Sequence, residues 1–242
     1  MTQSVARAAR STEDVVARMR GIGAGLDPRD GVACFNRAYL AVMELVGQGF
    51  AAGRFADRAF AERLAVVLAN LYFDAVDAAA AGRPVNPAWQ PLFEARGSRK
   101  VWPVQFAFAG MYAHVNHDLA PAVVATCIEC RTTPDTPPVH ADYLAVGELF
   151  ARVEAQVRAE FGARIGRVAP EAAQPLEHIV SGFSVERAGE AAWAAVQTLW
   201  HQRNIRPMYD ATLAAVTAST ALAGRMLVTP VLSPVEERDG EG

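Results

Sequence analysis

VWPVQFAFAGMYAHVNHDL, residues 101–119, is the stretch that decides the fold class. From residue 102 onward it is apolar on almost every side when it is drawn as a helix. A helix that is hydrophobic all round is buried in a core, because none of its sides is suited to water. The pattern therefore predicts a central helix over 102–119 that other helices surround.

Outside this stretch, apolar residues recur with the period of an α-helix. Ser11, Asp57 and Ser184 each precede such a segment and are residues of the type that caps a helix N-terminus. Pro121 is expected to open a further helix at its first turn. No segment alternates with a period of two over a useful length, so the sequence predicts helices throughout.

The fold class that follows is all-α, a single-domain bundle of seven or eight helices around the central helix. We expect the bundle to span residues 11–232, between a disordered tail over 1–10 and a disordered acidic tail over 233–242. The proline-rich loop over 131–138 leaves a division into two domains open. A single domain is favoured, because the central helix needs partners from both sides of that loop.

The composition excludes several classes of protein. The 242 residues carry 23 Lys and Arg against 26 Asp and Glu, without a basic stripe, so we expect no nucleic-acid partner. No apolar stretch reaches the roughly 20 residues of a membrane span, and the N-terminus lacks the apolar core of a secretory signal. Three cysteines argue against a disulfide framework and for a reducing compartment. We therefore expect a cytoplasmic protein that does not bind a membrane.

The segment MYAHVNHDL, residues 111–119, carries the strongest chemical signal. His114 and Asp118 are four residues apart and share one face of a helix. A carboxylate beside an imidazole fixes its tautomer and raises its basicity, which suits proton transfer. The pair suits a metal shell equally well, and it is also compatible with a purely structural pair in the core. His117 points about a quarter-turn away and is expected to face solvent.

Polar residues also interrupt other apolar segments, where burying a charge is costly unless it is paired. Arg37 and Glu44 lie on one helical stripe and are expected either to form an ion pair or to face a polar pocket. We expect the 57–80 helix to bring Asp74 within reach of His114. The predicted catalytic residues are His114, Asp118, Asp74 and Glu44, and the predicted substrate-binding residues are Arg37, Asn70, Met111, Asn116 and Trp193.

The cofactor is left open, and a divalent metal is compatible with the sequence. Its candidate ligands are His114, Asp118, Asp74 and His140. The signatures HExxH, GxSxG and Walker A are absent, as are the paired ExxH motifs of a di-iron bundle and an aspartate run of the DDxxD kind. None of the familiar helical or hydrolytic enzymes is therefore indicated.

Several longer segments carry a resemblance to a known family. They are FNRAYLAV at 35–42, ERLAVVLANLYFDAV at 62–76, GMYAHVNHDLA at 110–120, AAWAAVQTLW at 191–200 and LAGRMLV at 222–228. Together they resemble a bacterial all-helical family that is catalogued as a domain of unknown function. The family's motif resembles an AHxNxDL core, which maps onto His114, Asn116 and Asp118. The resemblance spans most of the chain and implies one helical domain, but no particular activity.

Three functions are compatible with these observations. The first is an enzyme of secondary metabolism that acts on a small, largely apolar molecule by His/Asp acid–base chemistry in a cyclisation, isomerisation or dehydration. The second is a metal-dependent hydrolase built on the same residues. The third is a non-catalytic helical binding module whose polar core only sets packing specificity. The expected partner of either enzyme is a small-molecule substrate, and the oligomeric state is left open.

Overall fold

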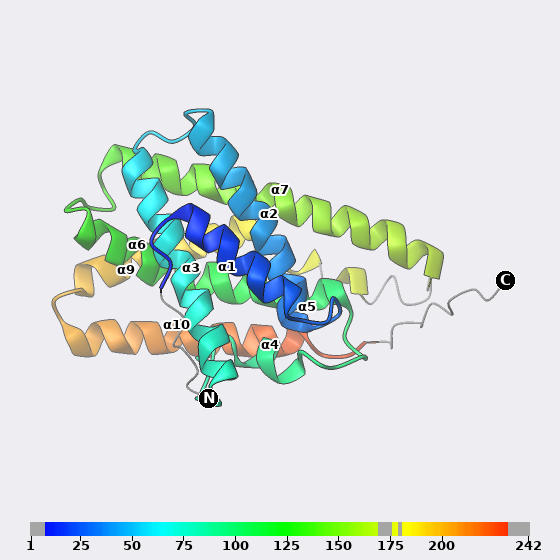
Figure 1. The fold of residues 1–242 in the computed structure, drawn as a ribbon. Helices are drawn as coiled ribbons and strands as arrows, with labels where there is room; N and C mark the ends of the chain where they lie inside the picture. Colours follow the sequence, from blue (N-terminus) through cyan, green and yellow to red (C-terminus); the bar gives the residue numbers. More distant parts are fainter. Residues whose placement is uncertain (1–7, 169–175, 179–180, 232–242) are drawn as a thin grey trace, which may run out of the picture.

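Nine α-helices and one π-helical turn make up the described part of the chain in the computed structural model (Figure 1). The structure describes residues 8–168, 176–178 and 181–231. The helices are α1 (Thr12–Ala24), α2 (Gly31–Ala51), α3 (Arg58–Ala80), α4 (Gln90–Ala95), α5 (Pro103–Ala113), α6 (Leu119–Glu129), α7 (Pro137–Val168), α9 (Val185–Gln202) and α10 (Arg206–Leu227). No strand occurs within the described ranges, so the predicted all-α class is confirmed.

The three predicted caps form as expected. Side-chain oxygens of Ser11, Asp57 and Ser184 accept hydrogen bonds from backbone N–H groups in the first turns of α1, α3 and α9. Each cap satisfies one of the amides that a helix start leaves unpaired. The helix count exceeds the predicted seven or eight, and one unexpected helix is α4, within a proline-rich connection. Its second residue is Pro91, at a position where a helix does not need the backbone N–H.

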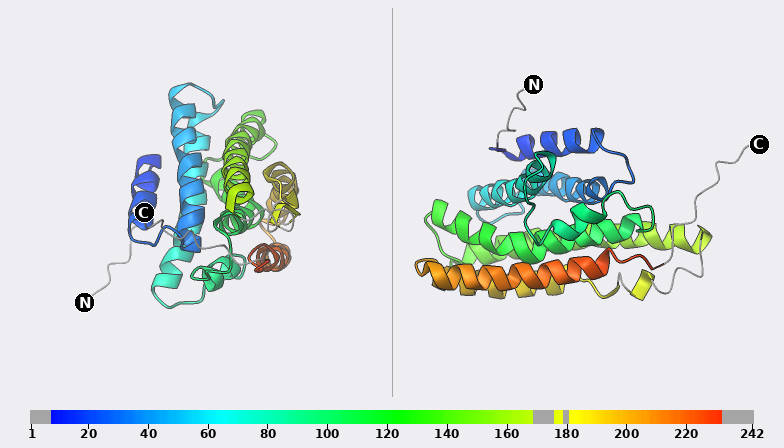
Figure 2. Two further views of the ribbon diagram at one scale, coloured as in Figure 1. Left: turned by 90° about the vertical axis from the view of Figure 1, so that its right-hand side faces the viewer. Right: turned by 90° about the horizontal axis from the view of Figure 1, so that it is seen from below.

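The helices stack in layers, which lie side by side in the left view of Figure 2. α1 covers the pair α2 and α3, the next layer holds α5, α6 and α7, and α9 and α10 form the far side. Because α5 contacts helices of the layers on both sides, all its residues from Val104 to Met111 are buried. The predicted central helix is therefore present.

The central helix does not end at residue 119, but continues through α6 to Glu129. Between α5 and α6 lies the π-helical turn η1 (His114–Asp118), in which the Leu119 N–H donates to the His114 carbonyl. Pro121 follows, and in a regular helix its ring would clash with the carbonyl of His117. A wider turn relieves that clash, so Pro121 lies inside a continuous helix and does not open a new one.

Two glycines set how closely the central helix approaches α2. A Cβ atom on Gly110 would lie 2.3 Å from the ring of Phe35, and one on Gly31 would lie 2.6 Å from the ring of Phe106. Such distances are far below van der Waals contact, so only glycine permits this packing. The close approach holds Phe35 against the N-terminal end of η1, where its ring centroid is 5.8 Å from that of His114.

The two expected tails fall largely outside the described residues. Residues 1–7 and 232–242 are not described, but Ala9, which the sequence placed in the first tail, is 7% exposed. Its N–H donates to the side-chain oxygen of Asn70 at 2.9 Å, and its carbonyl accepts from the Asn70 amide at 3.0 Å. Among the described residues, no helix is both long enough and apolar enough to cross a membrane.

Candidate functional site

A single buried carboxylate organises the polar core. Asp118 is 2% exposed, and its oxygens accept hydrogen bonds from three side chains. Oδ2 accepts from Trp89 Nε1 at 2.9 Å and pairs with His114 Nδ1 at 3.2 Å. Oδ1 pairs with His117 Nδ1 at 2.7 Å. The predicted pair of His114 and Asp118 is thus part of a larger group, which we call the Asp118 cluster: Trp89, His114, His117 and Asp118.

The hydrogen bonds decide the charge of Asp118. Burial alone would raise the pKa of this carboxyl, but the hydrogen bonds from His114 and His117, together with the electrostatic attraction to both rings, outweigh burial and hold its pKa below the ordinary value. Asp118 is therefore an ionised carboxylate, which can only accept hydrogen bonds. Both histidines must then carry a proton on Nδ1, which leaves the chemistry of each ring to its Nε2 atom.

His117 does not face solvent, contrary to the sequence prediction. It is only 6% exposed and shares the carboxylate with His114. Two features explain the difference. The π-helical turn changes the angular relation between consecutive side chains, and α9 and α10 pack against η1 and cover the side that a solitary helix would expose.

Aromatic rings from three parts of the chain surround His114. The nearest is Tyr39 of α2, whose ring centroid lies 4.2 Å from that of His114. Phe35 of the same helix, Trp89 before α4 and Phe150 of α7 have centroids 5.8, 6.0 and 6.1 Å away. His114 itself is 0% exposed. The imidazole therefore lies in a water-poor, aromatic environment.

Three polar atoms in this region are buried without a hydrogen-bond partner among the described residues. They are Nε2 of His114, Nε2 of His117 and the hydroxyl oxygen of Tyr39. Burial, with a smaller effect from Asp118, raises the pKa of Tyr39 well above its ordinary value, so the phenol keeps its proton. An unpaired buried polar group costs about 1–3 kcal/mol. A network that holds three such atoms is not optimised for stability alone.

The other predicted catalytic residues lie outside the cluster. Asp74 is exposed on α3, although its neighbour Phe73 is fully buried. Glu44 is also exposed and pairs with Arg20 of α1 at 3.0 Å, so the ion pair expected with Arg37 does not form. Arg37 is exposed as well. On α2 and α3 the inward faces carry enough apolar residues to leave these charges outside, where water solvates them.

The predicted substrate-binding residues are also dispersed. Asn70 is occupied by the backbone of Ala9, and Asn116 donates to the Tyr112 carbonyl at 3.3 Å. Met111 is buried in the core one turn before η1. Trp193 of α9 stacks on His140 of α7, with ring centroids 4.3 Å apart. Only Met111 and Asn116 therefore lie on the central helix beside the Asp118 cluster.

The structure does not assemble the candidate metal ligands. His140 is exposed on α7 and Asp74 is exposed on α3, whereas His114 and Asp118 are buried on η1. Within the described ranges, no group of three or more His, Cys, Asp and Glu side chains is arranged to hold a metal ion. The two histidines of the cluster both use Nδ1 on one carboxylate, which directs their Nε2 atoms away from it.

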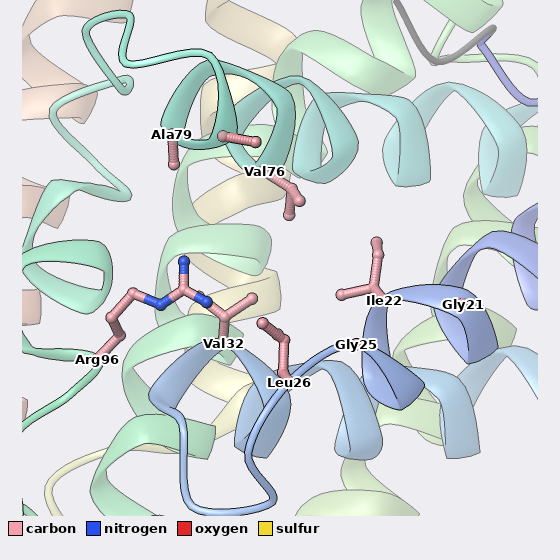
Figure 3. Close-up of a pocket in the computed structure, with 9 residues that line it drawn as sticks. Gly21, Ile22, Gly25, Leu26, Val32, Val76, Ala79 and Arg96 are labelled. Carbon is pink, nitrogen blue, oxygen red and sulfur yellow. The ribbon is translucent and has the colours of Figure 1, made fainter. Parts of the chain in front are cut away.

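A cavity of about 280 Å³ lies elsewhere, between the end of α1, the start of α2 and the end of α3. Figure 3 shows the side chains of Ile22, Leu26 and Val76 pointing toward this space, with Arg96 along one side. No residue of the Asp118 cluster lines it. The cavity wall is almost wholly apolar. Its one charged residue is Arg96, which forms an ion pair with Asp30 at 2.8 Å.

Comparison with known families gives one match. Residues 12–230 match a family described as a family of unknown function (DUF5995). The chain belongs to this family. The match covers η1 and every described helix, which agrees with one helical domain of the DUF5995 type. No curated protein and no solved structure matches the chain.

Sequence reasoning missed the aromatic residues that approach His114 in this DUF5995 protein. Trp89, Tyr39 and Phe150 approach His114 from remote parts of the chain. Nothing in the local sequence around Trp89 indicates a hydrogen bond to Asp118. His117 had a detectable signal, because it stands next to an aspartate in an otherwise apolar helix.

Proposed function

We propose that the protein is an enzyme that moves protons on a small, largely apolar molecule, with His114 as its acid–base group. The observation that carries this proposal is the arrangement of the His114 ring. Its Nδ1 is held by Asp118, while its Nε2 is buried and has no partner among the described residues. An oriented imidazole with a free second nitrogen is well suited to proton transfer in a water-poor site.

In the proposed reaction, His114 Nε2 accepts a proton from a carbon or oxygen atom of the substrate. Asp118 acts as a positioning residue, because its negative charge stabilises the imidazolium that forms. The Tyr39 hydroxyl, which stays protonated, can donate to a substrate oxygen on which charge builds up. Return of the proton to another atom completes an isomerisation or cyclisation. In a dehydration it leaves with a hydroxyl group as water.

The aromatic wall defines the class of substrate. Phe35, Tyr39, Trp89 and Phe150 contribute ring surface around His114, which suits an apolar or aromatic molecule with few polar groups. Such molecules are typical of secondary metabolism, and the free cysteines fit a cytoplasmic location. Asp74 and Glu44 have no part in this proposal, since both are exposed.

The full burial of His114 means that the substrate must open the wall to reach it. Phe150 of α7 stacks on Tyr39 of α2, with ring centroids 5.9 Å apart, so these two rings close the wall between the two helices. We propose that substrate enters between α2 and α7. Loop and helix motions of this kind limit the turnover of many enzymes.

A non-catalytic binding module is the second candidate function. The observation in its favour is that His114 is 0% exposed, as expected of a group that only specifies packing. In that case the Asp118 cluster would fix the register of the central helix against α2. The two candidates differ in whether His114 can be replaced without loss of a chemical activity.

The test is untargeted and uses His114→Asn, which keeps a polar group of similar reach. Apolar metabolites extracted from bacterial cells are incubated with the wild-type protein, with His114→Asn, or with the matched control Asp74→Asn, and the mixtures are analysed by mass spectrometry. We expect the wild type and Asp74→Asn to consume one metabolite and form a product of the same mass, or of that mass less one water. His114→Asn should form none. Equal conversion by His114→Asn would refute the assigned role.

A further inference from the structure

The cavity beside Arg96 has the size of a small-molecule site. It lies where the ends of α1 and α3 meet the start of α2, and its volume is about 280 Å³ (Figure 3). Val32 of α2 is buried, whereas Gly21 and Gly25 of α1 are exposed, so the cavity is closed beside Val32 and open to solvent beside α1. An apolar cavity of roughly 150 Å³ in another protein binds benzene. The space beside Arg96 is therefore large enough for a substituted benzene ring.

The two glycines of α1 that border the cavity are not required by packing. Beyond its own helix backbone, a Cβ atom on Gly21 would meet no atom within 4 Å, and one on Gly25 would meet only carbonyl oxygens of α1, at 3.6 and 3.7 Å. Gly25 has a φ of −88°, which any residue adopts. Gly21 lies within α1, where glycine is less stable than alanine. The backbone would accept larger side chains here, and their absence leaves the cavity open.

The side chain of Arg96 is held in place at the border of the cavity, where Figure 3 shows its guanidinium group beside Val32. Its Nε donates to Oδ2 of Asp30 at 2.8 Å, and its Nη2 lies 2.8 Å from the same oxygen. Asp30 is itself fixed as the N-cap of α2, because its Oδ1 accepts from the Val32 N–H at 2.8 Å. Nη1 of Arg96 makes no hydrogen bond within the described residues and is available as a donor.

The charges beside the cavity decide which polar group a ligand can carry. Arg96 and Asp30 together form a neutral pair. A carboxylate on the ligand would bring a net negative charge into a space that is otherwise apolar, and an uncompensated charge is costly to bury. A neutral carbonyl oxygen can accept a hydrogen bond from Arg96 Nη1 without adding charge. The remainder of the ligand must then be hydrocarbon, to match Ile22, Leu26 and Val76.

We propose that this cavity is a second small-molecule site, which binds a neutral, mainly hydrocarbon molecule about the size of a substituted benzene ring. Its single carbonyl oxygen accepts a hydrogen bond from Arg96. An apolar wall with one or two placed polar groups is the usual composition of a ligand pocket, since the polar groups fix the orientation of the ligand. The site shares no residue with the Asp118 cluster, so it does not depend on the role proposed for His114.

The test is a titration of the full-length protein with acetophenone, ethylbenzene and benzoate, followed by NMR of its methyl groups. Acetophenone should shift the methyl signals of Ile22 and Val76 saturably, with a dissociation constant on the order of 1 mM for a ligand of this size. Benzoate should give no saturable shift. Arg96→Met should weaken acetophenone on the order of 10-fold and leave ethylbenzene, which lacks the carbonyl, unchanged. The matched control is Arg99→Met, because Arg99 pairs with Asp27 and does not line the cavity.

A second pair of variants tests the place of binding. Val76→Phe should fill the cavity and abolish the acetophenone shifts, whereas Val67→Phe, at a half-buried position of the same helix outside the cavity, should not. Circular dichroism of each variant establishes that it is folded. The proposal is overturned if the wild type shows no saturable shift, if Arg96→Met binds acetophenone as the wild type does, or if benzoate binds more tightly than acetophenone. Shifts confined to Met111 would place the molecule at the Asp118 cluster and overturn it as well.

Discussion

Asp118 and Asp142 are both buried carboxylates, at 2% and 1% exposure, but they hold different kinds of groups. Asp142 of α7 accepts from the backbone N–H groups of Ala56 and Asp57, at 2.6 and 2.7 Å. It thereby attaches the connection between α2 and α3 to α7. Asp118 holds three side chains, and two of these keep an unpartnered ring nitrogen.

The comparison distinguishes a carboxylate with structural contacts from the one that the proposed function uses. A backbone amide held by a carboxylate has no further atom with which to react, so the contacts of Asp142 are those of a residue that stabilises the fold. An imidazole held by a carboxylate presents a second nitrogen whose basicity the carboxylate raises. Burial and hydrogen bonding alone therefore do not distinguish the two carboxylates. They differ in the groups that they hold, and this difference is the basis for the role proposed for Asp118.

The largest effect is expected for Asp118→Asn. The amide keeps the shape but loses the charge, and its NH₂ group faces a donor, so at least one buried N–H is left unpaired. Breaking a buried charged network of this kind costs about 3–5 kcal/mol. Urea unfolding followed by circular dichroism measures the loss. A variant as stable as the wild type would show that Asp118 is dispensable for the core.

Asp142→Asn should cost less, about 1–3 kcal/mol, since its partners are two backbone amides at the edge of the core. The sharper expectation concerns the ring nitrogens of His114 and His117. Their ¹⁵N chemical shifts should stay as in the wild type in Asp142→Asn and should change in Asp118→Asn. If both variants changed them alike, the two carboxylates would not differ in the way proposed.

Gly110→Ala tests the packing beside the Asp118 cluster. The new Cβ would meet the Phe35 ring at 2.3 Å, and overpacking of a core costs about 1–3 kcal/mol. Gly147→Ala in α7 is the control, because its Cβ would meet no atom within 4 Å. That substitution should stabilise the helix by about 0.5–1 kcal/mol. Opposite changes in thermal midpoint are expected, and a stable Gly110→Ala protein would contradict the tight contact.

The pH dependence of stability tests the charge of Asp118. The pKa of Asp118 is lower in the folded protein than its ordinary value of 3.8. The contribution of Asp118 to stability is therefore complete well above pH 3.8 and is lost as the pH falls through the folded pKa. Over that range the free energy of unfolding should fall by at most about 1.4 kcal/mol per pH unit. Acid unfolding of Asp118→Asn should lack this component. An unchanged acid limb would contradict the lowered pKa.

The smallest effect is expected for Asp74→Asn. Asp74 is exposed on α3, and surface substitutions usually change stability by less than about 0.5 kcal/mol. The ¹⁵N chemical shifts of His114 should not move either. A shift comparable to that of Asp118→Asn would place Asp74 in contact with the cluster and restore the site that the sequence predicted.

The features that the sequence predicted correctly depend on neighbours along the chain. The caps at Ser11, Asp57 and Ser184 involve amides three residues away, and the pair of His114 and Asp118 spans four residues. The central helix is likewise apolar on all sides, which predicts that it is buried whichever helices pack against it. Helical geometry alone connects these residues, so their relation can be read from spacing.

Tertiary structure decided the rest, because it depends on which helix faces pack against each other. Asp74 and Glu44 stand in apolar segments but lie on outward faces, whereas His117 is buried in a turn against which α9 and α10 pack. Trp89 reaches Asp118 across 29 positions of sequence, which no local spacing reveals. The π-helical turn depends on both the local sequence and the tertiary structure. Pro121 supplies a local reason for the turn, and the buried Asp118 cluster holds it in place.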